Sequence, residues 1–229
     1  MTIEDKLTTI ANNVPLVYDA GYNKGKAEGG DNPLYYATQP QTLFIGADFP
    51  KDYELTLRFK NTPNTFQQMF FNARCPKSVK IIIENHTTNV SFQNTFNLTS
   101  STPNLVTVDL TDIDGITDGF QMFSGQKLLT TVIGVLDLSA CTGTNATTNI
   151  FRYCSALGEV RFKENTIPKS ISFEYCSDLS KATIQSIIDG LAPITDGVAR
   201  TLTLHADLKA KLTDEQKATI TTTKGWTLA

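Results

Sequence analysis

The sequence predicts an α/β repeat protein: a solenoid of short parallel strands, preceded by a helical segment and followed by a mixed α/β segment. Three observations lead to this fold class. An apolar phrase returns along the chain, each return includes a strand-like run, and the pattern changes at both ends. A fixed order of apolar residues that recurs every roughly 22–28 residues indicates stacked units that bury their apolar faces against their neighbours.

The returning phrase assigns residues 61–180 to the repeats. Two copies keep a phenylalanine, a cysteine and a leucine at equal spacing, a third copy is looser, and two more lack the cysteine. The copies are Phe151-x-x-Cys154-x-x-Leu157-x-x-Val160-x-Phe162, Phe173-x-x-Cys176-x-x-Leu179, Phe71-x-x-x-Cys75-x-x-x-Val79-x-Ile81, Phe96 with the run 105–110, and Phe123 with the run 128–138. We expect the phenylalanines to fill the core opposite the strands.

Each unit predicts one short strand, and the strands should stack in parallel, one per unit. The predicted strands are residues 79–83, 106–110, 134–138 and 159–162. Between them lie turns rich in Asn, Thr and Ser, whose side chains can bond backbone groups and face solvent.

Residues 1–30 predict a helical segment for attachment or oligomerisation. Five apolar residues follow the 4-3-4-3 spacing of a coiled-coil seam, namely Ile3, Leu7, Ile10, Val14 and Val17. Pro15 divides the segment into two short helices, about 2–13 and 15–28. A segment this small cannot bury its own apolar face. We therefore expect a partner, either other copies of the chain, with a trimer as the favoured homo-oligomer, or another protein.

Both ends of the repeat region predict caps, because terminal strands otherwise expose unpaired edges. Residues 31–60 form the N-terminal β cap, with strands expected at 42–45 and 54–59. Residues 181–229 form the C-terminal cap.

The C-terminal cap begins with an amphipathic helix over 180–191, for which Ser180 is the expected N-cap. A strand follows at 201–204. Helical structure over 208–220 should divide near Thr213, which forms a capping-box pattern with Gln216. We expect Trp226 to pack on the last apolar face.

Composition and charge restrict the function classes. The chain has 229 residues, a formal net charge of −3 and 40% hydrophobic residues. This acidic balance argues against nucleic-acid binding, which needs a basic surface. No apolar run is long enough to span a membrane. The N-terminus lacks the pattern of a secretory signal, so we expect synthesis in the cytoplasm without export by the general route.

The cysteines predict structural rather than catalytic roles. None of Cys75, Cys141, Cys154 and Cys176 has the paired spacing of a zinc site. We interpret them as small buried side chains stacked with the phenylalanines. A disulfide between Cys154 and Cys176 stays open as an alternative, which a reducing site of synthesis disfavours.

The motifs of enzymes are missing, so we expect no catalytic residues and no cofactor. His86 and His205 stand outside any metal or triad spacing. One acidic stretch is a weak Ca²⁺ candidate through Asp112, Asp114 and Asp118, although it lacks a closing Glu and reads more simply as a solvated turn.

Two tyrosines predict a ligand face. Tyr153 and Tyr175 occupy the same position of the phrase, between its phenylalanine and its cysteine, so they should stack along one side. Stacked tyrosines can bind a sugar or a protein, and they can equally form a structural ladder.

The phrases at Phe151–Phe162 and Phe173–Leu179 resemble the units of the BspA-like leucine-rich repeat family. The other three copies match loosely, and the resemblance covers about half of the chain. It implies a leucine-rich-repeat-like solenoid.

The two ends resemble tail-associated structural proteins of phages and prophages from Gram-positive bacteria. The similar stretches are Lys6–Gly21, residues 179–205 and residues 225–228. The resemblance implies that the N-terminus attaches to a particle and that the solenoid projects outward.

We therefore expect a virion structural protein: a tail, baseplate or fibre component that displays the solenoid and can bind a host receptor. Its partners would be its own copies, other virion proteins through residues 1–30, and a host cell-surface glycan or protein. The alternative is a bacterial cell-surface adhesin, since relatives of the repeat family act at cell surfaces. A glycan depolymerase ranks third.

Overall fold

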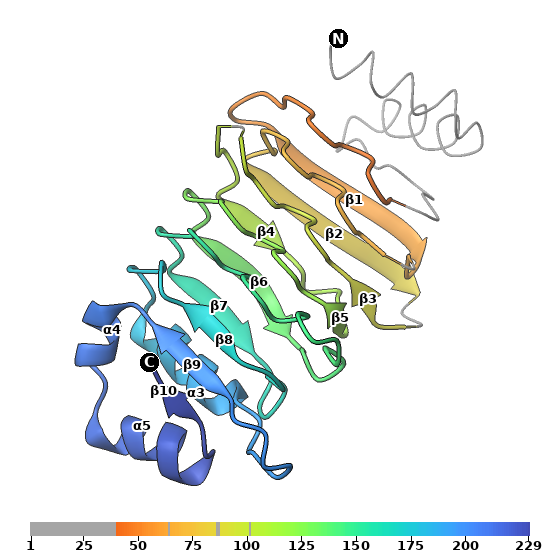
Figure 1. The fold of residues 1–229 in the computed structure, drawn as a ribbon. Helices are drawn as coiled ribbons and strands as arrows, with labels where there is room; N and C mark the ends of the chain where they lie inside the picture. Colours follow the sequence, from red (N-terminus) through yellow and green to blue (C-terminus); the bar gives the residue numbers. More distant parts are fainter. Residues whose placement is uncertain (1–39, 64, 86–87, 101) are drawn as a thin grey trace.

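The computed structural model describes residues 40–63, 65–85, 88–100 and 102–229 (Figure 1). Within these ranges the chain forms an α/β fold with parallel sheets and few helices, and no described helix is both long and apolar enough to cross a membrane. The predicted helices over 2–28, with Ile3, Leu7, Ile10, Val14 and Val17, lie outside the described residues.

The main element is a five-stranded sheet whose strands follow one another in chain order and pair in parallel throughout. Figure 1 shows them one beside the next, from β1 at the upper right down to β7 at the lower left. The strands are β1 (Glu54–Asn61), β2 (Ser78–Asn85), β4 (Thr107–Asp109), β6 (Thr131–Leu136) and β7 (Glu159–Phe162). The strands predicted at 54–59, 79–83, 106–110 and 159–162 are confirmed to within two residues.

The strand predicted at 134–138 corresponds to β6, which starts three residues earlier and contains Gly134 in its interior. The pairing of β6 with β7 shifts register between Thr131 and Val135, which marks a bulge. Gly134 has φ +105°, and a Cβ there would lie 2.9 Å from the carbonyl oxygen of Leu110. Glycine is required by this close approach and does not mark the start of the strand.

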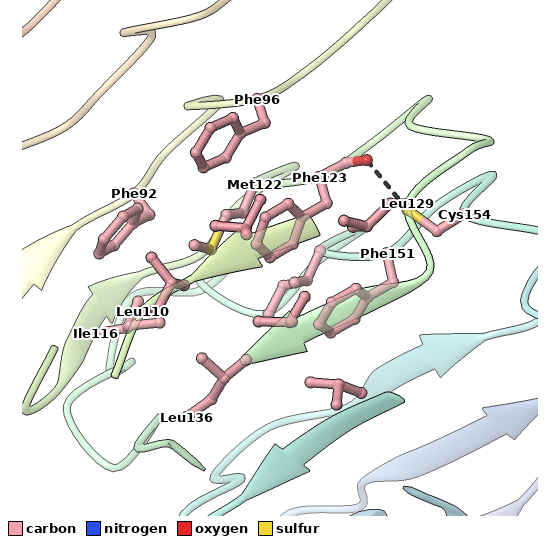
Figure 2. Packing of buried hydrophobic residues seen from close by; sticks show 14 of the residues in the cluster. Phe92, Phe96, Leu110, Ile116, Met122, Phe123, Leu129, Leu136, Phe151 and Cys154 are labelled. Carbon is pink, nitrogen blue, oxygen red and sulfur yellow. Dashed lines mark hydrogen bonds between the residues drawn. The ribbon is translucent and has the colours of Figure 1, made fainter. Parts of the chain in front are cut away.

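A row of phenylalanine rings fills the core opposite the sheet. Neighbouring rings stack with centroids 4.9–5.5 Å apart. Figure 2 shows part of this row with the aliphatic side chains that surround it. The row consists of Phe44, Phe70, Phe96, Phe123, Phe151 and Phe173. The sequence predicts Phe71 as the core ring of its segment, but Phe70 occupies the row and Phe71 is half-buried.

The backbone beside the rings is bonded from one turn to the next. The amide of Phe96 donates to the carbonyl of Met122 at 2.8 Å, and the amide of Phe123 donates to the carbonyl of Ile150 at 2.9 Å. Beside these bonds, β3 (Val90–Ser91) pairs in parallel with β5 (Ile116–Asp118). Backbone groups on the side away from the main sheet are thus satisfied by neighbouring turns.

Polar turn residues form ladders of their own. The side-chain amide of Gln41 donates to Gln67 at 3.0 Å, and that of Gln67 donates to Gln93 at 2.7 Å. Such ladders add hydrogen bonds between equivalent side chains of stacked segments. They account for part of the Asn- and Gln-rich composition of the turns.

The strand expected at 42–45 is wrong. These residues form turns, and Thr42 has φ +64°. The apolar run 43–45 resembles a strand because Phe44 belongs to the row of rings, whose backbone bends around the core instead of extending along a sheet.

Helix α3 (Lys181–Gly190) covers the outer edge of β7. Ser180 caps the helix as predicted. The hydroxyl of Thr183 accepts from the amide of Val160 at 3.3 Å, and that of Ser186 accepts from the amide of Phe162 at 2.8 Å. The edge amides of the sheet therefore have partners on the helix.

A second parallel sheet completes the C-terminal region with β8 (Ile171–Phe173), β9 (Thr201–Leu204) and β10 (Thr227–Leu228). Two short helices follow β9, namely α4 (Ala206–Ala210) and α5 (Asp214–Ala218), and a π-helical turn spans Thr219–Thr223. The strand at 201–204 and the capping box of Thr213 with Gln216 are confirmed. Trp226 is buried, and its Nε1 donates to the carbonyl of Ala192 at 2.8 Å.

Candidate ligand-binding surface

The chain makes a tight turn after each of five phenylalanines of the row. The amide three residues after Phe44, Phe70, Phe123, Phe151 and Phe173 donates back to the carbonyl of that phenylalanine at 3.0–3.1 Å. In all of these turns except the one after Phe173, the third residue has a positive φ, a conformation that favours Gly or Asn. These residues are Gly46 (62°), Asn72 (52°), Gly125 (86°) and Tyr153 (62°).

Tyr153 departs from this pattern. A bulky L-residue in the left-handed region carries a backbone cost of about 1–2 kcal/mol. Its side chain is 39% exposed, so core packing does not offset that cost. Non-glycine residues held in this conformation concentrate at functional sites, where the side chain itself is needed. Eight non-glycine residues have a positive φ in the described part of the chain, and Tyr153 is the one aromatic residue among them, so it points to a functional surface.

The two tyrosines singled out by the sequence are in contact. The ring centroids of Tyr153 and Tyr175 lie 4.4 Å apart, with the planes inclined at 48°. The guanidinium carbon of Arg152 lies 4.7 Å from the centre of the Tyr153 ring, and its Nη2 donates to the Tyr153 hydroxyl at 3.0 Å. The three side chains form one exposed group, which we call the tyrosine cluster.

The nearby charge affects the hydroxyl of Tyr175. The negative charge of Glu174, followed by the influence of Tyr153, raises the pKa of Tyr175 above its ordinary value. The hydroxyl therefore stays protonated at neutral pH, and its hydrogen bond with Tyr153 contributes to the raised pKa.

Two hollows flank the tyrosine cluster and share Arg152. The larger, of about 390 Å³, is bordered by Asn97, Gln121, Ser124, Lys127, Arg152 and Tyr153. The smaller, of about 300 Å³, is bordered by Asn149, Arg152, Ser172, Glu174 and Tyr175. Both have the size of small ligand sites. Their polar groups come from four consecutive turns of the phenylalanine row.

Asn97 borders the larger hollow and carries an unsatisfied acceptor. It is 2% exposed, and its Nδ2 donates to Asn94 at 2.8 Å and to Gln121 at 2.9 Å. Its Oδ1 is buried and has no hydrogen-bond partner among the described residues. A buried acceptor without a donor is costly and calls for an explanation.

The four cysteines are free and buried, and three of them donate hydrogen bonds from their thiols to backbone carbonyls in the core. The thiol of Cys154 donates to the carbonyl of Phe123 at 3.1 Å (Figure 2), that of Cys176 to Phe151 at 3.4 Å, and that of Cys141 to Ile116 at 3.1 Å. Burial raises the pKa of Cys141 and Cys176 to about 12, so these thiols are donors and not nucleophiles.

The acidic stretch does not form a metal site. Among the residues that the structure describes, no group of three or more His, Cys, Asp or Glu could hold an ion. Asp118 accepts from the amide of Phe120 at 2.8 Å, and so caps its own turn. The Ca²⁺ candidates Asp112, Asp114 and Asp118 are therefore not assembled as a cation site in this part of the chain.

The histidines supply no site chemistry here. His205 is the N-cap of α4, where its Nδ1 accepts from the amide of Asp207 at 3.3 Å, which is a structural role. His86 lies outside the described residues.

The sequence reading missed Arg152, Asn97 and Lys127. A signal was present for two of them. Counted from the phenylalanines of the row, Asn97 and Arg152 occupy the same position, one residue after Phe96 and Phe151. Asn97 and Arg152 border the larger hollow together with Tyr153.

Comparison of the chain with protein-family models, with curated proteins and with solved structures found no match. Any function must therefore be argued from the chain's own residues and from the motifs in its sequence.

Proposed function

We propose that this protein is a structural component of a phage virion, in the tail, baseplate or fibre, and not an enzyme. Residues 61–180 would form a leucine-rich-repeat-like solenoid that is displayed on the particle, and residues 1–30 would attach it or join copies of it, in a trimer by preference. The displayed surface would contact a host cell-surface glycan or protein.

The row of phenylalanine rings supports the solenoid most strongly. The stacked rings and the chain-ordered parallel strands carry the same spacing through most of the described chain. Each segment is bonded to the segments before and after it, as expected of a solenoid in which each unit contacts its neighbours. Residues 40–60 and 181–229 would then act as the two caps, and the bonds from Thr183 and Ser186 to β7 fit that role.

The virion location is supported by the resemblance of both ends to tail-associated phage proteins. An elongated body with one exposed tyrosine cluster suits a part whose task is display and contact. We prefer this function to the adhesin alternative, which is favoured by the resemblance of the repeats to a family with members at cell surfaces.

Fractionation separates these two functions. Particles from a producing strain would be banded by density and compared with the cell-wall fraction, using an antibody raised against residues 40–229. A virion protein should band with the particles. Recovery in the cell wall alone would instead establish the adhesin alternative.

Light scattering tests the proposed role of residues 1–30. We expect the full chain to form a trimer and a version that lacks residues 1–30 to be a folded monomer. Two monomers would rule out self-assembly through this segment and leave docking on another virion protein as its role.

A further inference from the structure

We propose that the larger hollow and the tyrosine cluster bind an acidic glycan, with a sugar ring packed against the exposed part of the tyrosine cluster and its anionic group beside Arg152 and Lys127. This inference rests on the proposed function only for the origin of the glycan, a host cell surface. The proposed function predicts a surface ligand in general terms, and this inference names its binding site and its chemical class.

The choice of a sugar follows from the side chains that meet here. Exposed aromatic rings give the apolar face of a sugar ring a flat surface to pack on, and polar groups around them can bond its hydroxyls. Tyr153 and Tyr175 supply rings that are each 39% exposed. Asn97, Gln121 and Ser124 supply amide and hydroxyl groups at the border of the larger hollow.

The backbone of Tyr153 indicates that its ring is needed. The other turns with a positive φ at this position contain Gly46, Asn72 or Gly125, which accept that conformation at low cost. A tyrosine at φ +62° is retained against that preference. An exposed side chain that is kept at a backbone cost is most simply explained by contact with a ligand.

The charge of the larger hollow favours an anion. Its lining contains two cations, Lys127 and Arg152, and no carboxylate. Arg152 uses one guanidinium nitrogen on the Tyr153 hydroxyl, so its other donors stay available for a carboxylate or a phosphate. The smaller hollow contains Glu174 opposite Arg152, and it fits a neutral sugar that continues the same oligosaccharide.

The unpartnered oxygen of Asn97 is the second, independent observation. It belongs to a side chain that is almost fully buried at the border of the larger hollow, and its amide nitrogen is already used twice. A ligand hydroxyl that reaches it after a small rotation of the carboxamide would supply the missing donor.

The test is binding of the full chain to an array that carries neutral, uronic-acid-bearing, sialylated and phosphorylated oligosaccharides. We expect acidic glycans to be bound and their neutral counterparts to be bound at least about tenfold more weakly. Binding only to carboxylated or only to phosphorylated members identifies the anionic group, and either result supports the site. No binding to any acidic glycan, or equal binding to neutral ones, overturns it.

Variants then locate the site. Tyr153→Asn keeps the backbone preference seen at Asn72, and Arg152→Gln removes the shared cation. Each should weaken binding about tenfold or more, as expected for anchor residues. Ile133→Thr, on the exposed face of the five-stranded sheet, is the control that should bind normally. Unchanged binding by Tyr153→Asn, or loss in Ile133→Thr, overturns the assignment. Particle fractionation is independent of these results, so failure of the glycan site and failure of the virion location are distinguishable.

Discussion

The thiol of Cys154 donates a hydrogen bond to the carbonyl oxygen of Phe123, across 3.1 Å in the core (Figure 2). Cys176 does the same for Phe151, and the side chain of Gln126 does so for Phe96 at 2.7 Å. In each case a side chain three residues after one phenylalanine satisfies the carbonyl of the preceding phenylalanine of the row. The cysteines therefore connect consecutive turns as donors as well as filling space.

This role predicts that volume alone cannot replace Cys154. Cys154→Val restores apolar volume but removes the thiol donor, so that the Phe123 carbonyl keeps only its bond from the Gln126 amide, and we expect both Cys154→Ala and Cys154→Val to lower the free energy of unfolding by about 0.5–1.5 kcal/mol. Urea denaturation gives the difference. Cys75→Val is the control, because the Cys75 sulfur makes only two long contacts, 3.8 Å to the Ala73 carbonyl and 3.7 Å from the Gln126 side-chain amide. Full recovery of stability in Cys154→Val would show that only size matters.

The thiols should resist modification in the folded protein. Burial raises the pKa of Cys75, Cys141 and Cys176 to about 12 and that of Cys154 well above its ordinary value. A colorimetric disulfide reagent at pH 8 should therefore label none of the four thiols promptly in native protein and all four in urea. Since the thiol pKa values are raised in the folded protein, burial of the neutral thiols stabilises the fold fully below the ordinary thiol pKa. This stabilisation is lost as pH rises toward 12. Prompt native labelling would contradict the buried arrangement.

The strands and the elements of residues 181–229 were predictable because local signals agree there. The apolar residues of 159–162 and 201–204 alternate with polar ones, and Ser180 and Thr213 have the residue types that cap helices. The strand expected at 42–45 was wrong because three apolar residues in a row do not distinguish a strand from a turn with one inward ring. The position of β6 depended on the close approach of Gly134 to Leu110, which only the tertiary structure provides.

The candidate site was only partly predictable, for a similar reason. Their equal spacing in the sequence predicted that Tyr153 and Tyr175 stack, and the structure places their rings in contact. The positive φ of Tyr153, the position of Arg152 over its ring and the unpartnered oxygen of Asn97 depend on backbone geometry and on neighbouring turns. Sequence periodicity reports which positions are equivalent, but not which of them departs from the shared geometry.

Tyr153 should tolerate asparagine and reject valine. Tyr153→Asn suits the left-handed backbone, and we expect the free energy of unfolding to change by less than about 1 kcal/mol, because strain relief offsets the lost ring contact. Tyr153→Val places a β-branched residue at positive φ and should cost about 2 kcal/mol or more. Tyr175→Val is the matched control, since Tyr175 is not among the residues with positive φ. Equal effects of the two valine variants in thermal denaturation would argue against a strained Tyr153.

Thr183 should protect the edge of β7 against pairing with other chains. Its hydroxyl donates to the Gly158 carbonyl at 2.8 Å and accepts from the Val160 amide. Thr183→Val keeps the shape but leaves the Val160 amide unpaired, while the Gly158 carbonyl keeps its bond from the Ser180 amide, so we expect the free energy of unfolding to fall by about 1–3 kcal/mol and aggregation on mild heating to increase. Light scattering during a thermal ramp measures this. Thr221→Val, which removes a hydroxyl bonded only within its own helical segment, should behave like the unmodified protein. Equal aggregation of the two variants would contradict the protective role.

Asp137 predicts a pH-dependent contribution to stability through its contact with Lys163. Its side chain is 11% exposed and accepts from Lys163 Nζ at 2.7 Å and from the amide and hydroxyl of Ser139 at 2.9 and 2.6 Å. Partial burial raises the pKa of Asp137, but the bonds from Lys163 and Ser139 outweigh it, and the pKa is lowered overall. A carboxyl whose folded pKa is lowered stabilises the protein above its ordinary pKa of about 3.9, and this stabilisation is lost as pH falls through the folded pKa.

Asp137→Asn should therefore lower the free energy of unfolding by about 1–3 kcal/mol at pH 7, the usual value of hydrogen bonds to a charged group, and by much less below about pH 3. Urea denaturation from pH 7 down to pH 2.5 measures the gap between the variant and the unmodified protein. Asp112→Asn changes the net charge equally and is the control, with little effect expected at any pH. A stability gap for Asp137→Asn that stays constant down to pH 2.5 would show that size or packing, and not the ionised carboxylate, is responsible. A gap that closes on acidification assigns the stabilisation to the charged contact with Lys163 and Ser139.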